Sequence, residues 1–585
     1  MLPGYCNYAT VPQFLLPFKL ITRILYLMRT IILSIQGKKY TLPAFSTAKE
    51  ALEEAGLYQN ELKRYEDNPI IGALVNGELK PLSAPVPMSC EIEPVRAFQG
   101  FGRRIYRHSI CFLLCYASRL LFPRRRLKIG HSLGDGFYFN YEDDKGADDA
   151  LVQKLSDKMK ELVSQALEIT CVTVSVQEAI RRLKKQGYDD AVLLLKSMNK
   201  SYVNMYRIQE YYHIAYEPIA NNTAELGLWN LSKYGEGGML LRYPVRESIT
   251  ELVPFKDNQR LYEVFNEYHV WGKILGVECV GEMNKCCSDK NAEQYVRLSE
   301  SLQRRKISSI ADAIHSKKAK AVFIAGPSSS GKTTFAKKLC EQLLLLEYSP
   351  IKISLDDYYK KRDLVPLDDE GKPDFEALEA LDTDMFDRNM QDLFDGKAVD
   401  LPHFSFTRNE TYYLNQPIKM NPNTIFVIEG IHGLNPKITS KIEPKYVYKV
   451  YISALTQLNM DDCNRVSTTD DRMLRRILRD YMTRGTSAEE TLLMWPSVAR
   501  GERTHIFPNQ NNADVMFNSA LDYELGVLSP FVTPLLQGVS PDSGTAYTHA
   551  RRLLEFLETI YAIPSTFVPS DSILREFIGG SDYED

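Results

Sequence analysis

The chain has 585 residues, 44% of them hydrophobic, so it is too long for a single core and is predicted to form roughly three or four domains. Its 71 Lys and Arg residues are balanced by 75 Asp and Glu residues, and the net charge of −4 excludes a basic field over the whole molecule. Any nucleic-acid partner would have to bind a local patch.

The ten cysteines show neither paired CxxC spacing nor the density of a small secreted disulfide scaffold. We therefore expect reduced thiols and a cytoplasmic protein. Cys111 and Cys115 lie four residues apart without a histidine at ligand spacing, and they are interpreted as core thiols of one helix.

The first 27 residues do not have the pattern of a targeting segment. The apolar stretch from Phe14 to Met28 is interrupted by Lys19 and Arg23, and it lacks the order of charge and cleavage site that a signal peptide requires. No uncharged apolar run of about 18 residues is present, so no membrane span is predicted. We interpret residues 1–27 as an extension that is either disordered or a non-native start.

Residues 28–96 are predicted to form a small β-rich domain with one helix near residues 47–55. The Asn76-Gly77 pair between alternating apolar runs indicates a β-hairpin. The segment ALVNGELKPLS resembles the TGS domain, a ubiquitin-like module found in threonyl-tRNA synthetases and some GTPases. The resemblance implies a β-grasp fold with a binding or regulatory role and no chemistry of its own.

Residues 97–255, with RHSICFLLCYASRLLFP and KIGHSLGDGFYFNYE, resemble the α+β second additional domain of threonyl- and alanyl-tRNA synthetases. Editing versions of that domain hold a metal on an HxxxH pair and a later Cys/His pair. Here His108 is followed four residues later by Phe112, and ELGLWNLSKYGEGG supplies neither Cys nor His, so we predict no zinc and no editing hydrolysis. RNA contact through the basic run 124–128 stays open, although a solvated surface is favoured.

Residues 256–318 carry apolar positions at helical spacing and are predicted to be a helical connector between the two halves of the chain. The following block, residues 319–530, carries the chemistry.

A phosphate-binding loop opens this block. The apolar run AVFIA leads into GPSSSGKT, a complete GxxxxGK[ST] motif, and an amphipathic helix follows from Thr333 to about Leu345. The loop amides and the helix dipole would hold an anion, Lys332 would reach the β- and γ-phosphates, and Thr333 would bind magnesium. The predicted ATP-binding residues are Gly326, Ser328, Ser329, Ser330, Gly331, Lys332, Thr333 and Thr334.

Two carboxylates end the next predicted strands. Asp356 follows PIKISL, where it could accept the proton of an acceptor hydroxyl. Glu429 closes TIFVIE in the manner of a Walker-B acid, which holds magnesium directly or through water. The site is therefore predicted to use Mg²⁺ with ATP.

A helix predicted from Thr469 to Gly485 places Arg472, Arg475, Arg476 and Arg479 on one face. Few acids are expected on that stripe, and repulsion between the guanidiniums would be relieved by an anion. We interpret this helix, with Arg484 at its end, as a lid over the triphosphate.

Together GPSSSGKTT, SLDDYY, FVIEGIHGL and RRILRDYMTRG resemble the uridine kinase and phosphoribulokinase family over about 200 residues. The resemblance implies an α/β P-loop kinase whose parallel sheet is flanked by helices, and it places the catalytic role on Asp356. On the acceptor side it implies Tyr358, Glu376, His403, Phe404 and Arg408, a set that departs from the polar contacts of uridine kinases.

The predicted function is ATP-dependent phosphorylation of a hydroxyl on a small molecule, with a nucleoside of the uridine type first. The alternatives are a sugar-phosphate acceptor, or a regulatory nucleotide-binding protein whose N-terminal half binds RNA or a small ligand. The oligomeric state stays open.

Residues 531–585 are predicted to hold an amphipathic helix at about residues 546–562 and an acidic end. Ile573, Leu574, Phe577 and Ile578 are expected to pack back on a domain, and no catalytic group is predicted there.

Overall fold

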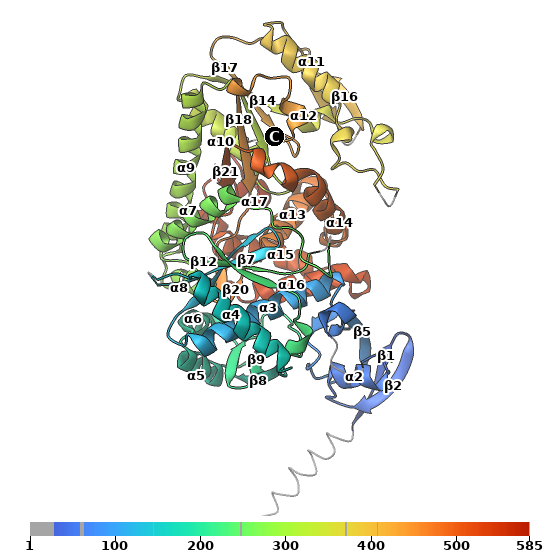
Figure 1. Cartoon of the computed structure of the whole chain (residues 1–585). Helices are drawn as coiled ribbons and strands as arrows, with labels where there is room; N and C mark the ends of the chain where they lie inside the picture. The colour runs from blue at the N-terminus through green and yellow to red at the C-terminus, as the bar shows by residue number, and fades with distance from the viewer. Residues whose placement is uncertain are drawn as a thin grey trace, which may run out of the picture.

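The computed structural model describes residues 29–58, 64–143, 145–245, 248–368, 371–405 and 408–583. The predicted extension, residues 1–27, lies outside the described residues. Figure 1 shows a small N-terminal sheet at one end of the molecule and a parallel sheet with the C-terminal half of the chain at the other. None of the helices among the described residues is long and apolar enough to cross a membrane.

The first unit is a five-stranded sheet of order β2-β1-β5-β3-β4 with one helix, the arrangement of a β-grasp module. Its elements are β1 (Thr30–Ile35), β2 (Lys38–Pro43), α2 (Ala48–Glu54), η1 (Tyr65–Asp67), β3 (Ile70–Val75), β4 (Glu78–Lys80) and β5 (Cys90–Arg96). The predicted hairpin at Asn76-Gly77 is confirmed: it joins β3 to β4, and both residues have positive φ, 48° and 74°, as a type I′ turn requires.

The second unit packs one long buried helix against two antiparallel sheets, β10-β9-β8 and β11-β12-β7-β6. Its helices are α3 (Gly100–Leu121), α4 (Asp149–Ser164), α5 (Val176–Gln186), α6 (Asp189–Ser197) and η2 (Thr223–Glu225). Its strands are β6 (Leu127–Leu133), β7 (Gly136–Tyr141), β8 (Thr170–Ser175), β9 (Tyr202–Ile208), β10 (Tyr211–Ile214), β11 (Asn230–Tyr234) and β12 (Gly238–Arg242).

Three helices connect the halves: α7 (Gln259–Leu275), α8 (Val280–Ser288) and α9 (Ala292–Lys317). Asn284 on α8 donates to Ser197 Oγ at 2.9 Å and to the Thr559 carbonyl at 2.8 Å, so one buried amide joins the second unit to the C-terminal segment. The apolar side of α9 belongs to the same core as the parallel sheet.

The kinase-like unit is built on an all-parallel sheet of order β14-β17-β13-β18-β21. The central strands β13 and β17 are buried at every position, which explains their unbroken apolar runs in the sequence. The strands are β13 (Ala321–Ala325), β14 (Ser349–Ser354), β15 (Pro402–Ser405), β16 (Glu410–Tyr413), β17 (Thr424–Glu429), β18 (Val447–Ser453), β19 (Asn459–Asp461), β20 (Asn464–Arg465) and β21 (Val515–Asn518).

The helices of this unit run from α10 to α15, with short turns between them. They are α10 (Lys332–Leu344), η3 (Leu355–Tyr358), η4 (Arg362–Leu364), η5 (Leu378–Ala380), α11 (Thr383–Phe394), α12 (Pro436–Thr439), η6 (Pro444–Tyr446), α13 (Thr468–Arg484), α14 (Ala488–Gly501), the π-turn η7 (Glu502–Ile506), η8 (Phe507–Asn512) and α15 (Glu524–Gln537).

The C-terminal segment adds η9 (Pro541–Ser543), α16 (Thr545–Leu557), η10 (Ser565–Phe567) and α17 (Arg575–Ile578). The residues predicted to pack back on a domain are buried, and they join the core of the parallel sheet: Ile573, Leu574, Phe577 and Ile578. Two boundaries differ from the sequence prediction: α16 ends at Leu557, and α13 begins at Thr468, with Ser467 as its N-cap.

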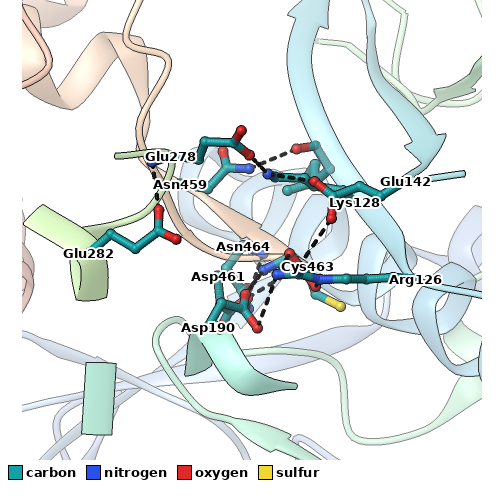
Figure 2. A network of polar contacts seen from close by, with 12 residues as sticks. Arg126, Lys128, Glu142, Asp190, Glu278, Glu282, Asn459, Asp461, Cys463 and Asn464 are labelled. Atoms are coloured by element: carbon teal, nitrogen blue, oxygen red, sulfur yellow. Dashed lines mark hydrogen bonds and ion pairs between the residues drawn. The ribbon is translucent and has the colours of Figure 1, made fainter. Parts of the chain in front are cut away.

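The β19–β20 hairpin of the kinase-like unit is held against the second unit by charged side chains (Figure 2). Arg126 pairs with Asp462, and Lys128 lies 3.0 Å from Glu142 and also pairs with Glu278. Arg125 pairs with Asp143 at 2.6 Å. These three cations of the basic run considered for RNA contact therefore have carboxylate partners within the protein.

Candidate active site

The phosphate-binding loop lies between β13 and α10, at the carboxyl edge of the parallel sheet. A Cβ at Gly326 would lie 1.9 Å from the Ile452 carbonyl oxygen, so only glycine fits there. Gly331 has φ +79°, and a Cβ there would meet Ile573 at 2.5 Å. Ser329 also has positive φ, at 58°. The loop therefore adopts the tight turn that the motif requires, and its glycines are sterically necessary.

Lys332 and Thr333 begin α10 and face the carboxyl ends of β14 and β17. The Lys332 ammonium donates to the carbonyls of Gly326 and Pro327, each at 3.1 Å, and burial lowers its pKa although Glu429 and Asp356 oppose the shift. Thr333 Oγ1 donates to Glu429 Oε1 at 3.3 Å. The two oxygens proposed for magnesium are thus adjacent.

The register between β14 and β17 places Asp356 close to Glu429. Ser354, at the end of β14, is paired with Glu429 at the end of β17, and Asp356 follows two residues later in η3. Burial raises the pKa of Asp356, while the charges of Lys332 and of Arg484 oppose that shift. Burial, together with Asp356, raises the pKa of Glu429 to about 7. The predicted base and the predicted magnesium acid therefore lie close enough for their charges to interact.

Two further carboxylates touch the loop, and sequence reasoning missed both. Glu502, in the turn after α14, accepts the Ser328 N–H at 3.1 Å. Glu576, on α17, accepts from the Thr334 hydroxyl at 2.8 Å and from the Thr334 N–H at 3.4 Å. No local motif marks either residue, because each reaches the loop only through the packing of a segment distant in sequence. The C-terminal segment, in which no catalytic group is predicted, thus contributes Glu576 as a contact of the loop.

The expected lid helix, α13, packs against the loop, but its arginines do not form an unpaired stripe. Arg472 pairs with Glu502 and donates to the Ser328 carbonyl at 3.1 Å. Arg475 is fully buried and is held by Glu524 at 2.5 Å. Arg475 Nη1 also lies 3.5 Å from the carbonyl oxygen of Ser329 in the loop. The buried pair with Glu524 favours a structural role for Arg475, and its role in the lid stays a prediction.

The other lid residues gather around one buried acid, Asp480. It lies 3.1 Å from Arg476, 2.9 Å from Arg479 and 3.4 Å from Arg484. Arg476 also donates to Ser328 Oγ at 2.7 Å. Three guanidiniums therefore share one carboxylate next to the phosphate loop, and their role as anion-binding groups stays a prediction.

Glu376 belongs to the same cluster on the acceptor side. Burial, with the charge of Glu502, raises the pKa of Glu376 to about 7, and Arg476, Lys332 and Asp356 all lie close enough to act on it. Gly501, at the end of α14, packs directly on its side chain: a Cβ there would lie 2.5 Å from the Glu376 Cβ.

The β15–β16 hairpin is joined to the residue after Asp356. Asp357 accepts the Phe404 N–H at 3.2 Å, and its other oxygen lies 3.6 Å from His403 Nδ1. The His403 ring stacks on Tyr412 with centroids 5.5 Å apart. The structure thus brings His403 and the Phe404 backbone to the edge of the cluster.

Two acceptor-side predictions do not hold in the structure. Tyr358 is 1% exposed, packs on Phe386 and accepts from Asn389 at 3.2 Å, so it is a core residue rather than a substrate contact. The Arg408 side chain is 65% exposed and pairs with Glu410. Arg408 also lies over the ring of Tyr412, 5.5 Å from its centroid, and so meets the hairpin beside His403.

Among the described residues, no group of three or more His, Cys, Asp or Glu side chains could hold a metal ion. A magnesium ion that arrives with a triphosphate needs only one or two protein oxygens, and Thr333 and Glu429 supply them.

Comparisons with known proteins divide the chain in the same way as the fold. Residues 321–525 match the model of the phosphoribulokinase / uridine kinase family. The uridine kinase of Macrococcus caseolyticus is 29% identical over 197 residues, which are 33% of this chain and 84% of that protein.

The N-terminal region is similar to threonine–tRNA ligases. That of Finegoldia magna is 26% identical over 149 residues, which are 25% of this chain and 24% of that enzyme, so the match spans about a quarter of its length. Among solved structures, D-glycerate 3-kinase from Cryptococcus neoformans aligns with 35% of this chain and 89% of its own, at 13% identity and a TM-score of 0.26. The chain therefore joins a synthetase-like region to a kinase-like one.

Proposed function

We propose that residues 319–530 transfer the γ-phosphoryl group of ATP to a hydroxyl of a small molecule, with a nucleoside of the uridine type as the first candidate. The observation that carries this proposal is the cluster of Lys332, Asp356 and Glu429 around a complete phosphate loop. The family match over residues 321–525 supports the same reaction class. Residues 28–96 are proposed to be a TGS-like binding module and residues 97–255 a synthetase-like domain without hydrolytic activity.

The residues divide the reaction between them. Lys332 and the loop amides bind the phosphates, and Arg476, Arg479 and Arg484 offset negative charge on the group in transit. Asp356 accepts the proton of the acceptor hydroxyl, the hydroxyl oxygen forms the new bond to the γ-phosphorus, and the bond to the β-phosphate oxygen breaks to release ADP. Burial moves the pKa of Asp356 upwards, towards neutral pH, and a general base works best when its pKa lies near the working pH.

Magnesium fits the donor set at Thr333 and Glu429, which offers hard oxygen ligands of the kind that the ion prefers. When bound, it would neutralise charge on the β- and γ-phosphates. The Lys332 ammonium would leave its present partners, the carbonyls of Gly326 and Pro327, to meet the phosphates.

The acceptor side favours a neutral substrate over a sugar phosphate. Asp357, Asp374 and Glu376 border it, and burial raises the pKa of Asp357 and Glu376. Half-buried carboxylates of this kind accept hydrogen bonds from sugar hydroxyls but repel a phosphate group.

An acceptor panel tests the proposal. Purified protein with ATP and magnesium is given nucleosides, free sugars and sugar phosphates, and ADP release is measured beside Asp356→Asn and the exposed control Asp363→Asn. We expect acceptor-dependent ADP release that falls about 100-fold or more in Asp356→Asn and is unchanged in the control. The kinase proposal fails if no acceptor raises ADP release above the Asp356→Asn level.

A regulatory nucleotide-binding protein is the second candidate, and one observation favours it. Glu502 and Glu576 hold the loop amides of Ser328 and Thr334, which a triphosphate would otherwise bind. In that case the panel would show nucleotide binding without acceptor-dependent turnover, measured by calorimetry with a non-hydrolysable ATP analogue.

A further inference from the structure

A large cavity lies away from the phosphate loop, between the second unit, β4 of the first unit, α16 and the start of α13. Its volume is about 540 Å³, within the range of small-molecule sites. Residues of α3, β20 and the first turn of α13 line it together. Figure 2 shows the β19–β20 hairpin that brings β20 to the second unit. The cavity therefore exists only when the two halves of the chain are assembled.

Most cations of the cavity wall are neutralised within the protein. Arg104 pairs with Glu217 at 2.6 Å and Arg552 with Asp470 at 2.7 Å. The remaining pairs, further out, are Lys80 with Glu555, Lys200 with Glu558 and Arg551 with Glu78.

Arg107 and Arg465 are different. Among the described residues, neither has a carboxylate within ion-pair distance, and Arg107 Nε and Arg465 Nη1 are buried without a hydrogen-bond partner. Arg465 donates only to neutral oxygens, those of Val466, Thr456 and Thr468. Both guanidiniums lie over the ring of Phe137, at 5.5 and 5.7 Å from its centroid.

These two charges act on each other. Burial lowers the pKa of Arg465 to about 10, and the positive charge of Arg107 adds to that shift. The phenol beside Arg107, Tyr243, is neutral, because burial raises its pKa to about 12. Two half-buried like charges without a counter-ion are costly, and an anion in the cavity would relieve that cost.

The other residues of the cavity wall indicate the chemistry of the uncharged part of the ligand. Phe137, Met198, Ile214 and Val466 give it an apolar surface. His108 also faces the cavity, with Nε2 unpartnered, and burial lowers its pKa to about 3, so it meets a ligand as a neutral group. A ligand with a carboxylate or phosphate at one end and an apolar group at the other matches this wall.

We propose that this cavity is a binding site for a small amphipathic anion, a carboxylate or a phosphate monoester, whose charge is held between Arg107 and Arg465. The ligand would touch the first turn of α13, the helix whose other residues contact the phosphate loop. The proposal is independent of the kinase reaction, because no residue of the phosphate loop takes part.

Calorimetric titration of the full chain with phenyl phosphate, benzoate and inorganic phosphate tests it. We expect one site per chain that binds phenyl phosphate or benzoate more tightly than inorganic phosphate. Affinity should fall about 10- to 100-fold in Arg107→Met and Arg465→Met, as for loss of a charge-assisted hydrogen bond. It should be retained in Arg181→Met, an exposed arginine on α5 of the same unit.

The phosphate loop can also bind these anions, so Lys332→Met is titrated in parallel. Binding that survives Lys332→Met and is lost in the two cavity variants supports the proposal. It is overturned if wild-type protein binds none of the probes at about 10 mM, or if binding follows Lys332 and ignores Arg107 and Arg465.

If the variants fail to fold, hydrogen–deuterium exchange of the wild-type protein with phenyl phosphate tests the same proposal. Protection of residues 104–112 and 460–470 supports the site, and protection confined to residues 326–334 overturns it.

Discussion

Glu576 is the carboxylate whose removal should change nucleotide binding most directly. It comes from the short helix α17 near the end of the chain and accepts hydrogen bonds from the hydroxyl and the N–H of Thr334. Its charge acts on Lys332 and Glu429 as well. Glu576→Gln keeps an oxygen that can accept from Thr334 and removes only the negative charge. We therefore expect nucleotide triphosphate to bind this variant more tightly than the wild type.

The magnitude follows from Coulomb's law. A phosphate on the loop would lie about 6 Å from the Glu576 carboxylate, where two unit charges interact by about 3 kcal/mol at an effective dielectric constant of about 20. Neighbouring cations and solvent screen part of this, so a gain of about 1–2 kcal/mol, or about 5- to 30-fold in affinity, is expected. The carboxylate also caps the positive end of α10, so its loss should lower stability by about 0.5–1 kcal/mol.

Calorimetry with a non-hydrolysable ATP analogue and magnesium measures the first effect, and denaturant unfolding measures the second. Glu347→Gln is the matched control, because Glu347 follows the far end of α10 and is exposed. Unchanged or weaker nucleotide binding in Glu576→Gln, beside an unchanged control, would refute the idea that Glu576 competes with the phosphates.

Three further predictions test other parts of the structure. The pKa of Glu429, raised from 4.5 to about 7, means that magnesium-dependent nucleotide affinity should rise from about pH 6 to about pH 8. Stability without metal should fall as pH rises from about 4.5 to about 7 and then level off, because between these values the folded state holds a proton that the unfolded state releases. A flat pH profile that matches Glu429→Gln would contradict this. Arg475→Met should lower the free energy of unfolding, measured with denaturant, by about 3–5 kcal/mol, because it leaves the buried Glu524 carboxylate without its partner. A loss of activity without a loss of stability would instead assign Arg475 to the lid. Gly77→Ala should cost about 1–2 kcal/mol, because φ is +74° and the new Cβ would lie 2.9 Å from Tyr547; Gly56→Ala, with φ +69° and open space around it, separates the strain from the clash, and equal costs would exclude the contact with Tyr547.

Local sequence patterns determined the elements that carry the site. The unbroken apolar runs of β13 and β17, the glycines of the phosphate loop and the Asn76-Gly77 turn each depend on short-range sterics and on burial, so they could be predicted from neighbouring residues. The meeting of Asp356 with Glu429 also follows from sequence, because parallel strands bring their carboxyl ends to one edge.

Helical spacing, by contrast, did not reveal which arginines are available. Arg475 and Arg476 occupy adjacent positions of α13. Only tertiary packing decides that Arg475 is paired with the buried Glu524 while Arg476 donates to Ser328 Oγ. Tyr358 is similar: its position beside Asp356 suggested a substrate contact, but the core around Phe386 takes up its ring.

The sequence by itself thus predicted the reaction class that we propose, since a phosphate loop and two strand-end acids are local features in a known order. The tertiary structure alone decided what surrounds them. Glu502 and Glu576 reach the loop, and Arg107 meets Arg465 across 358 positions of the chain. The physical reason is that the protonation and the availability of a charged side chain depend on the groups that surround it. Those groups come from segments that no local sequence pattern connects.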